Sequence, residues 1–193
     1  MKLLLAASIV LMLSSIAIAI PNSQLLGPYK VSFDLNANYQ TQITQPVDSD
    51  SSSTYQMILI QNNSTFALIG IKEYTEPQDA TLKVHKNLMP MSMIIREGLN
   101  ASIAKDIKID GKDGFLIESV PFTEDDNATV VYRAMYWLDS EDFGPVSAGT
   151  TSVTITSTYP LDVTEGLLSS LRIVKGEASA AAPANGGQVL PPE

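Results

Sequence analysis

Two clusters of acidic side chains are the residues of this chain best suited to chemistry. Carboxylates gather at Glu124–Asp126 and at Asp139–Asp142. Calcium binds several loop oxygens at once, and a pair of carboxylates can hydrolyse a glycosidic bond. The second cluster begins like an EF-hand loop but has Phe143 where an oxygen ligand is needed. We expect no cofactor; calcium is the alternative, with five candidate ligands, Asp125, Asp126, Asp139, Glu141 and Asp142.

Histidine and cysteine offer little further chemistry. His85 is the single histidine and cysteine is absent, which excludes thiol catalysis, cysteine-ligated zinc and iron–sulfur clusters. A histidine base needs a nucleophile beside it, and the chain has no Gly-x-Ser-x-Gly motif. Tyr132 and Tyr136 alternate to one face of a strand and Trp137 to the other, a pattern typical of core packing. We therefore expect a structural His85 and no catalytic residue.

Four asparagines lie in Asn-x-Ser/Thr triplets, the acceptor pattern for N-linked glycans. All four fall at expected loops or ends of elements, where a glycan leaves the core undisturbed. A chain rich in serine and threonine also produces such triplets by chance, so glycosylation and composition are equal alternatives. The four are Asn62, Asn63, Asn100 and Asn127.

The first residues have the order of a secretory signal peptide. A lysine at position 2 precedes an apolar run over residues 3–18, and residues 17–19 form a small-x-small cleavage site ending at Ala19. Pro21 follows at once, and no cluster of Lys or Arg acts as a stop-transfer signal. We therefore expect cleavage near Ala19 rather than a retained membrane anchor. The mature product is expected to be secreted or held at the cell surface.

Charge and cysteine content restrict the partners. The formal net charge of −9 disfavours binding to nucleic acid and to anionic lipid surfaces. An exported domain without disulfides must rely on packing alone, which is common in prokaryotic proteins. We expect a protein or cell-surface partner, no nucleic acid, and no membrane association after signal cleavage.

The chain between residues 30 and 71 has the apolar periods of β-strands. Residues 31–39 alternate between apolar and polar side chains, as a strand with one buried face does. Residues 55–60 and 66–71 are almost continuously apolar and are separated by a polar segment. That pattern predicts a hairpin whose strands are covered on both faces. The acidic and serine-rich run 48–53 is expected to be a structureless loop.

The period changes to that of a helix over Asp79–Glu97. We expect its apolar stripe to pack against strands at 66–71 and 130–138. Pro90 removes a backbone donor inside the helix, which predicts a kink or a break near Met89. The stripe consists of Ala80, Val84, Leu88, Met91 and Ile95, of which Val84, Leu88 and Ile95 are the expected core residues.

The C-terminal half adds strands and a short helix. Strands are predicted at 107–109, 115–120, 130–138 and 153–159, with a turn at 110–114 whose two glycines supply positive φ angles. Residues 162–165 have the spacing of a capping box that opens a helix ending near Arg172. The total is six or seven strands, one long interrupted helix and a C-terminal helix. Strands in adjacent runs favour a largely antiparallel sheet with helices packed on it, an α+β fold.

Several segments resemble the Mog1/PsbP-like α/β/α sandwich family. They are the turn sequence at Ile109–Phe115, the aromatic pair Tyr136-Trp137, and the Ser-Thr-Tyr-Pro segment at 157–160 that leads into Leu167–Ile173. The resemblance covers Tyr29–Ile173. It implies a sandwich of this type and a small accessory or binding protein without catalysis, and no ligand residues carry over.

These features predict a single domain. We expect a signal peptide at 1–19, a lead-in at 20–28, a globular domain at 29–175 and a disordered Ala/Pro/Gly tail at 176–193. Two functions are open. The favoured one is an exported, non-catalytic domain that acts by binding or assembly at the cell surface or in the extracytoplasmic space. The alternative is a secreted, carboxylate-based hydrolase, with or without calcium.

Overall fold

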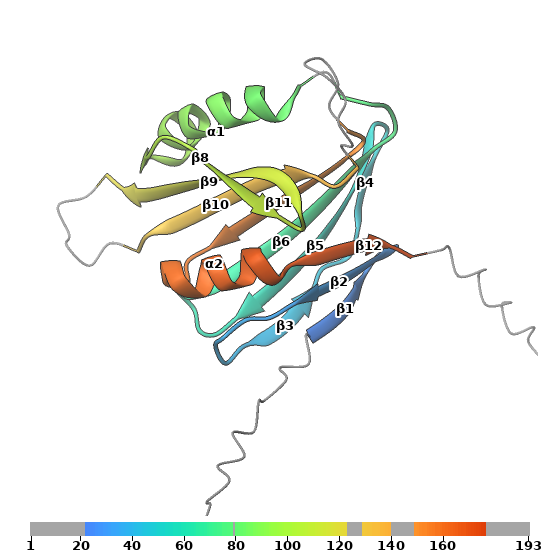
Figure 1. Cartoon of the computed structure of the whole chain (residues 1–193), viewed down its shortest axis with the longest axis horizontal. Helices are drawn as coiled ribbons and strands as arrows, with labels where there is room; N and C mark the ends of the chain where they lie inside the picture. The colour runs from blue at the N-terminus through green and yellow to red at the C-terminus, as the bar shows by residue number, and fades with distance from the viewer. Residues whose placement is uncertain (1–21, 79, 123–128, 140–148, 177–193) are drawn as a thin grey trace, which may run out of the picture.

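A computed structural model describes residues 22–78, 80–122, 129–139 and 149–176 of the chain (Figure 1). Within these residues the secondary structure consists of twelve strands and two helices. The strands are β1 (Asn22–Leu26), β2 (Tyr29–Phe33), β3 (Gln40–Ile43), β4 (Val47–Ser49), β5 (Ser52–Ile60), β6 (Phe66–Tyr74), β7 (Leu99–Ala101), β8 (Lys105–Ile109), β9 (Lys112–Pro121), β10 (Val131–Trp137), β11 (Thr151–Ser157) and β12 (Arg172–Lys175). The helices are α1 (Leu82–Glu97) and α2 (Leu161–Ser170).

The strands form two antiparallel sheets. The small sheet has the order β1-β2-β12. The large sheet has the order β3-β5-β6-β11-β10-β9-β7, with β4 paired to β5 and β8 paired to β9. The helix α1 packs on one face of the large sheet, whereas α2 and the small sheet pack on the other (Figure 1).

The main hydrophobic core lies between the large sheet and the layer made by the small sheet and α2. Alternate residues of each strand point into it, because side chains of a strand project to opposite faces in turn. Val31 and Phe33 of β2 meet Leu59 of β5 and Ile69 of β6, and α2 adds Leu168. All five are buried, so this layer holds the domain together.

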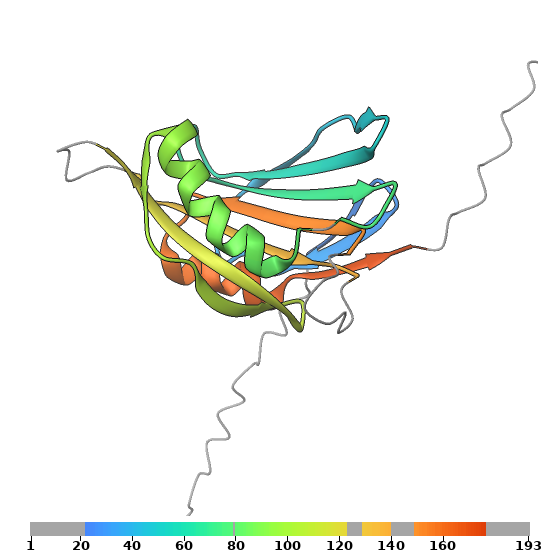
Figure 2. The ribbon, with the colours of Figure 1, turned by 90° about the horizontal axis from the view of Figure 1, so that it is seen from above.

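A smaller core lies on the opposite face of the large sheet, under α1. Met93 of α1 is fully buried against Phe115 and Ile117 of β9 and against Met135 and Trp137 of β10. Figure 2 shows α1 lying along the yellow strands of the sheet, with the teal strands β5 and β6 to one side. The helix therefore covers only part of the face on which it packs.

The predicted α+β class with a long interrupted helix is wrong. Strands account for 51% of the described residues and the two helices for 19%, so the fold is dominated by antiparallel sheet. The strands that sequence reasoning missed are short, and β3 and β4 are the most exposed of them. All four residues of β3 and all three of β4 are exposed, and such strands carry no apolar period.

The helix α1 is also uninterrupted, so of the kink or break predicted near Met89 the break does not occur. It passes through Pro90 as one element of 16 residues. Its ends are well defined, because the Thr81 side chain accepts a hydrogen bond from the Val84 amide and Gly98 ends the helix with a φ of 66°. Glycine adopts this left-handed conformation without a steric cost. Caps at both ends offset the one backbone bond that proline removes.

The face of α1 that packs on the sheet is the opposite of the predicted one. Met93, which is off the predicted stripe, is fully buried. Leu88 and Ile95, which were expected in the core, are 56% and 75% exposed, and Val84 is exposed as well. The apolar period identified a helix correctly, but it did not identify the side that the sheet covers.

Two local predictions are corrected by the backbone. The polar run 48–53 is not structureless: it forms the end of β4, a turn at residues 50 and 51, and the start of β5, and the Ser52 amide donates to Ser49 Oγ at 3.2 Å. The turn between β8 and β9 is formed by Asp110 and Gly111, with φ of 54° and 74°. Gly114, the second glycine of that predicted turn, lies inside β9, where a Cβ would be 2.9 Å from the Met135 carbonyl oxygen.

The predicted capping box at 162–165 is absent. The helix α2 begins at Leu161, Pro160 is its N-cap, and no side chain caps it. Thr164 is instead buried, and its hydroxyl donates to the Tyr159 carbonyl oxygen at 3.2 Å. The acidic residue in the first turn, Asp162, still has the sign of charge that a helix N-terminus favours.

Candidate functional site

The structure places one of the five calcium candidates. Asp139 follows β10, and its carboxylate accepts hydrogen bonds from the Thr150 amide at 2.6 Å and the Thr151 amide at 3.0 Å. Gly149 permits this approach, since a Cβ there would be 2.0 Å from Asp139 Oδ1. Within the described residues no group of three or more His, Cys, Asp or Glu side chains could hold a metal ion. The other four candidates, Asp125, Asp126, Glu141 and Asp142, lie outside the described residues.

These contacts define a structural role for Asp139 that an experiment can separate from calcium binding. We expect Asp139→Ala to lower the free energy of unfolding by about 1–3 kcal/mol, because two backbone amides lose their acceptor. The loss should be equal in chelator and in calcium, as measured by urea denaturation. Asp48→Ala, at an exposed acid of β4, is the control and should have no effect. A loss seen only with calcium present would instead identify Asp139 as a ligand.

His85 lies between α1 and the sheet, where its ring packs against an aromatic side chain. Its ring centroid is 5.8 Å from that of Trp137, which in turn is 6.1 Å from the ring of Tyr74. Lys72 stands over the Tyr74 ring at 4.8 Å. Burial lowers the pKa of His85 below its usual value of 6.5, because the protonated ring loses hydration. The neutral imidazole therefore acts as a packing residue.

This burial makes stability depend on pH in a definite direction. The unfolded chain binds the His85 proton more readily than the folded chain, so stability is full above pH 6.5 and falls as the pH drops toward the folded pKa. His85→Phe keeps a ring against Trp137 and should remove this part of the dependence between pH 7 and pH 5. Thermal melts at several pH values compare the two proteins. If the melting temperatures of the two proteins change with pH in parallel, His85 makes no contribution to the pH dependence of stability.

The three aromatic residues of β10 pack as predicted. Tyr132 and Tyr136 belong to the main core and Trp137 to the core under α1. All three are buried, and burial raises the pKa of Tyr136 well above its usual value, with the nearby Asp110 carboxylate adding to the effect. Core packing of these rings is therefore confirmed.

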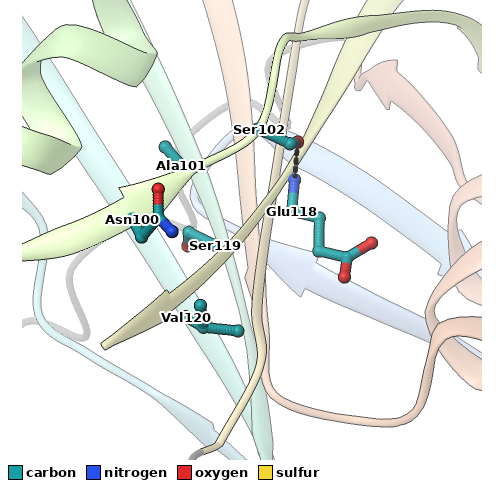
Figure 3. Close-up of a pocket in the computed structure, with 6 residues that line it drawn as sticks. All are labelled: Asn100, Ala101, Ser102, Glu118, Ser119 and Val120. Carbon is teal, nitrogen blue, oxygen red and sulfur yellow. Dashed lines mark hydrogen bonds between the residues drawn. The ribbon is translucent and has the colours of Figure 1, made fainter. Parts of the chain in front are cut away.

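A shallow pocket of about 220 Å³ lies along β7 and β9. Its two hydroxyl groups are engaged with the backbone, since Ser102 Oγ accepts from the Glu118 amide at 3.1 Å and Ser119 Oγ donates to the Val131 carbonyl oxygen at 2.9 Å. Figure 3 shows the Glu118 carboxylate directed away from Asn100 and Ser102. A single carboxylate that points out of the pocket does not form the acid–base pair of a glycosidase.

The structure places three of the four glycosylation candidates on the surface. Asn62 and Asn63 are exposed in the turn between β5 and β6, and Asn100 is exposed in β7. Asn62 Oδ1 accepts hydrogen bonds from the amides of Ser64 and Thr65, at 2.9 and 2.8 Å. Asn127 lies outside the described residues. Glycosylation stays a prediction.

The most unusual surface feature is the apolar stripe on the outer side of α1. We define the outer stripe as Val84, Leu88, Met91 and Ile95, all of which are exposed. Their spacing of four, three and four residues aligns them along one side of the helix, opposite the buried Met93. A continuous apolar stripe on the solvent side of a helix is a feature of interaction surfaces.

A second apolar surface lies beside α1 and is identified by the strand register. Directly opposed residues of antiparallel strands point to the same side of a sheet. Arg133 of β10 is on the α1 side, because its guanidinium forms two hydrogen bonds with Glu97, at 2.6 and 3.0 Å. Arg133 opposes Thr156 of β11, Thr156 opposes Leu68 of β6, and Leu68 opposes Ile58 of β5. All these side chains therefore share one face.

We call the part of this face over β5, β6 and β11 the open face. Each of its residues is half-buried, whereas their sequence neighbours Met57, Leu59 and Ile69 are fully buried on the opposite face. The predicted cover on both faces of β5 and β6 is therefore wrong: only one face is fully covered. The open face consists of Gln56, Ile58, Ile60, Phe66, Leu68, Thr154 and Thr156.

The open face ends in a hollow near the turn between β5 and β6. Ile58, Ile60 and Phe66 line its apolar side, Asn62 and Asn63 line its rim, and its volume is about 300 Å³. This hollow extends the apolar surface to the edge of the domain. Sequence reasoning missed this hollow. The available signal was the nearly continuous apolar runs of β5 and β6, because such runs are typical of strands that are buried on both faces.

Comparison with known proteins assigns no family to this chain. No family model, no curated protein and no solved structure matches it. The resemblance to the Mog1/PsbP-like family therefore stays a prediction. In the part of the chain that the structure describes, none of the helices has the length and apolar character needed to cross a membrane.

Proposed function

We propose that this chain is an exported, non-catalytic domain that acts by binding or assembly outside the cytoplasm. The observation that carries the proposal is the exposure, on one side of the molecule, of apolar side chains patterned like those of core elements. The outer stripe of α1 has the period of a buried helix face, and β5 and β6 have the apolar runs of strands covered on both faces.

A partner that removes apolar surface of this kind from water stabilises the complex. Burial contributes about 25 cal/mol per Å² of apolar area, so four large side chains and an adjoining sheet face offer several kcal/mol of binding free energy. Export rests on the signal-peptide pattern of residues 1–19, which lie outside the described residues. The carboxylate hydrolase has no comparable support, since the one placed candidate, Asp139, binds backbone amides.

Photo-crosslinking in the native host tests the proposal. A photoreactive residue at position 88, in the outer stripe, should give a discrete higher-mass adduct after export. The same residue at position 25 is the control, because Leu25 is 71% exposed but lies in β1 of the small sheet. The adduct at position 88 should disappear when Ile58→Asp is added on the open face. Equal adducts at both positions, or none at position 88, would contradict a binding role for this side.

A further inference from the structure

We infer that the open face and the flank of α1 together bind an amphipathic helix of a partner protein, with an apolar stripe bordered by acidic residues. This inference rests on the proposed binding function and specifies the chemistry of the partner. It follows from the dimensions of the open face, from the height of α1 beside it, and from the charges around both.

The open face has the width of one helix. Neighbouring strands lie about 4.7–4.9 Å apart, so β5, β6 and β11 together span about 14 Å. A helix with its side chains is about 10–12 Å across. Helices that pack side by side lie about 8–10 Å apart, which is the distance of two strands. A helix placed beside α1, which sits on β9 and β10, would therefore lie over β11 and β6.

The flank of α1 beside the open face can contact such a helix. His85 is on this flank, because its ring contacts Trp137 and Trp137 contacts Tyr74 of β6. Ser92 and Arg96, seven and eleven residues further along, share the flank. Leu88 and Ile95 lie next to this flank on the surface of α1 and are exposed. An apolar helix on the open face would bury Leu88 and Ile95 as well as Ile58 and Leu68.

The charges around this surface favour a negatively charged partner. Among the described residues, Lys72 of β6 and Arg96 of the flank form no ion pair, although the whole chain has a net charge of −9. Of the carboxylates near α1 that the structure describes, Asp106 pairs with Lys86 at 2.6 Å and Glu97 pairs with Arg133 at 2.6 Å. Glu76, in the loop before α1, is the exception. A local excess of free cations selects acidic flanks on the partner helix.

The same charges disfavour a second copy of this chain. At helical spacing the outer stripe of α1 is bordered by Lys83 on one side and by Arg96 on the other. A second copy would therefore present cations beside its apolar stripe and not the acidic flanks that the charges on this surface select. A symmetric dimer through this helix is therefore the weaker arrangement.

A lipid surface also fits less well than a helix. The outer stripe lies about one helix diameter above the sheet, so a flat bilayer that touched Leu88 would leave the open face in water. The net charge of −9 opposes approach to anionic lipid. Only a partner about as thick as one helix contacts the open face and the flank of α1 at the same time.

Two designed peptides test the inference with the purified full chain. Both are amphipathic helices of about 18 residues, a length that spans α1. They share one apolar stripe and differ only in flanking residues, which are glutamate in one and lysine in the other. Fluorescence anisotropy should show binding of the glutamate peptide about tenfold or more tighter than the lysine peptide, with a preference that weakens in high salt.

Variants of the chain test whether the preference for the glutamate peptide depends on the cations beside the open face. Arg96→Glu should reduce or reverse the preference for the glutamate peptide, whereas Lys30→Glu, an exposed change in β2, should leave it unaltered. Equal binding of both peptides, or of neither, would overturn the inference. So would binding to vesicles of equimolar phosphatidylcholine and phosphatidylglycerol that is lost in Leu88→Asp, or a dimer in sedimentation that the same variant dissociates. If position 88 still forms its adduct, these results reject the partner chemistry and leave the binding function standing.

Discussion

Leu59→Ala is expected to lower the free energy of unfolding by about 2–5 kcal/mol, whereas Leu88→Ala is expected to change it by less than about 0.5 kcal/mol. The two substitutions delete the same atoms. Leu59 is fully buried between the sheets, where truncation leaves a cavity, and Leu88 is mostly exposed on the outer stripe. Urea denaturation of the purified chain measures both values.

This comparison separates a core helix face from an interaction surface. A large loss of stability in Leu88→Ala would show that the outer stripe is covered within the domain itself. That result would remove the reason to expect a partner there. A small loss in both variants would instead contradict the position of the main core between the two sheets.

Ile58→Asp is expected to weaken partner binding by about 100-fold while leaving the isolated domain folded. The variant loses the burial of an isoleucine and places an unpaired carboxylate against an apolar partner, and a cost of about 2.7 kcal/mol corresponds to that factor. The half-buried position of Ile58 on the open face limits the effect on folding. Titration with the glutamate peptide measures the affinity, and a thermal melt measures stability.

Leu25→Asp is the matched control for this variant. Leu25 is an exposed apolar residue of β1, on the small sheet, so its change should leave both affinity and melting temperature unaltered. Loss of binding in Leu25→Asp as well would indicate a general effect of added negative charge. Unchanged binding in Ile58→Asp would exclude the open face from the contact.

The sequence predicted the elements with strong apolar periods and failed where the period was absent. The strands near 55–60 and 66–71 were located from nearly continuous apolar runs, the strand near 115–120 from the turn that precedes it, and the helix near 79–97 from apolar residues that recur at spacings of three and four. The strands β3 and β7 have three or four residues and little buried surface, so propensity alone could not find them. The capping box failed because its spacing is common and α2 begins before it.

The candidate surface could be predicted only in part, for a physical reason. A period shows that one side of an element is apolar, but which neighbour covers that side depends on long-range packing. Leu88 and Ile95 were assigned to the core on period alone, and the buried Met93 was missed. The open face depends on register between β5, β6 and β11, which no local signal specifies.

Hydroxyl-radical footprinting tests the central claim most directly, because it measures solvent exposure of the outer stripe and the open face in the native state. Met91 and Phe66 should be oxidised readily in the purified chain, since Met91 is exposed and Phe66 is half-buried at the edge of the hollow. In the exported material isolated under native conditions, a partner should protect both residues, while Leu25 on the small sheet keeps its exposure. Equal oxidation of Met91 and Phe66 in the two samples would contradict the claim that a partner covers this side of the molecule.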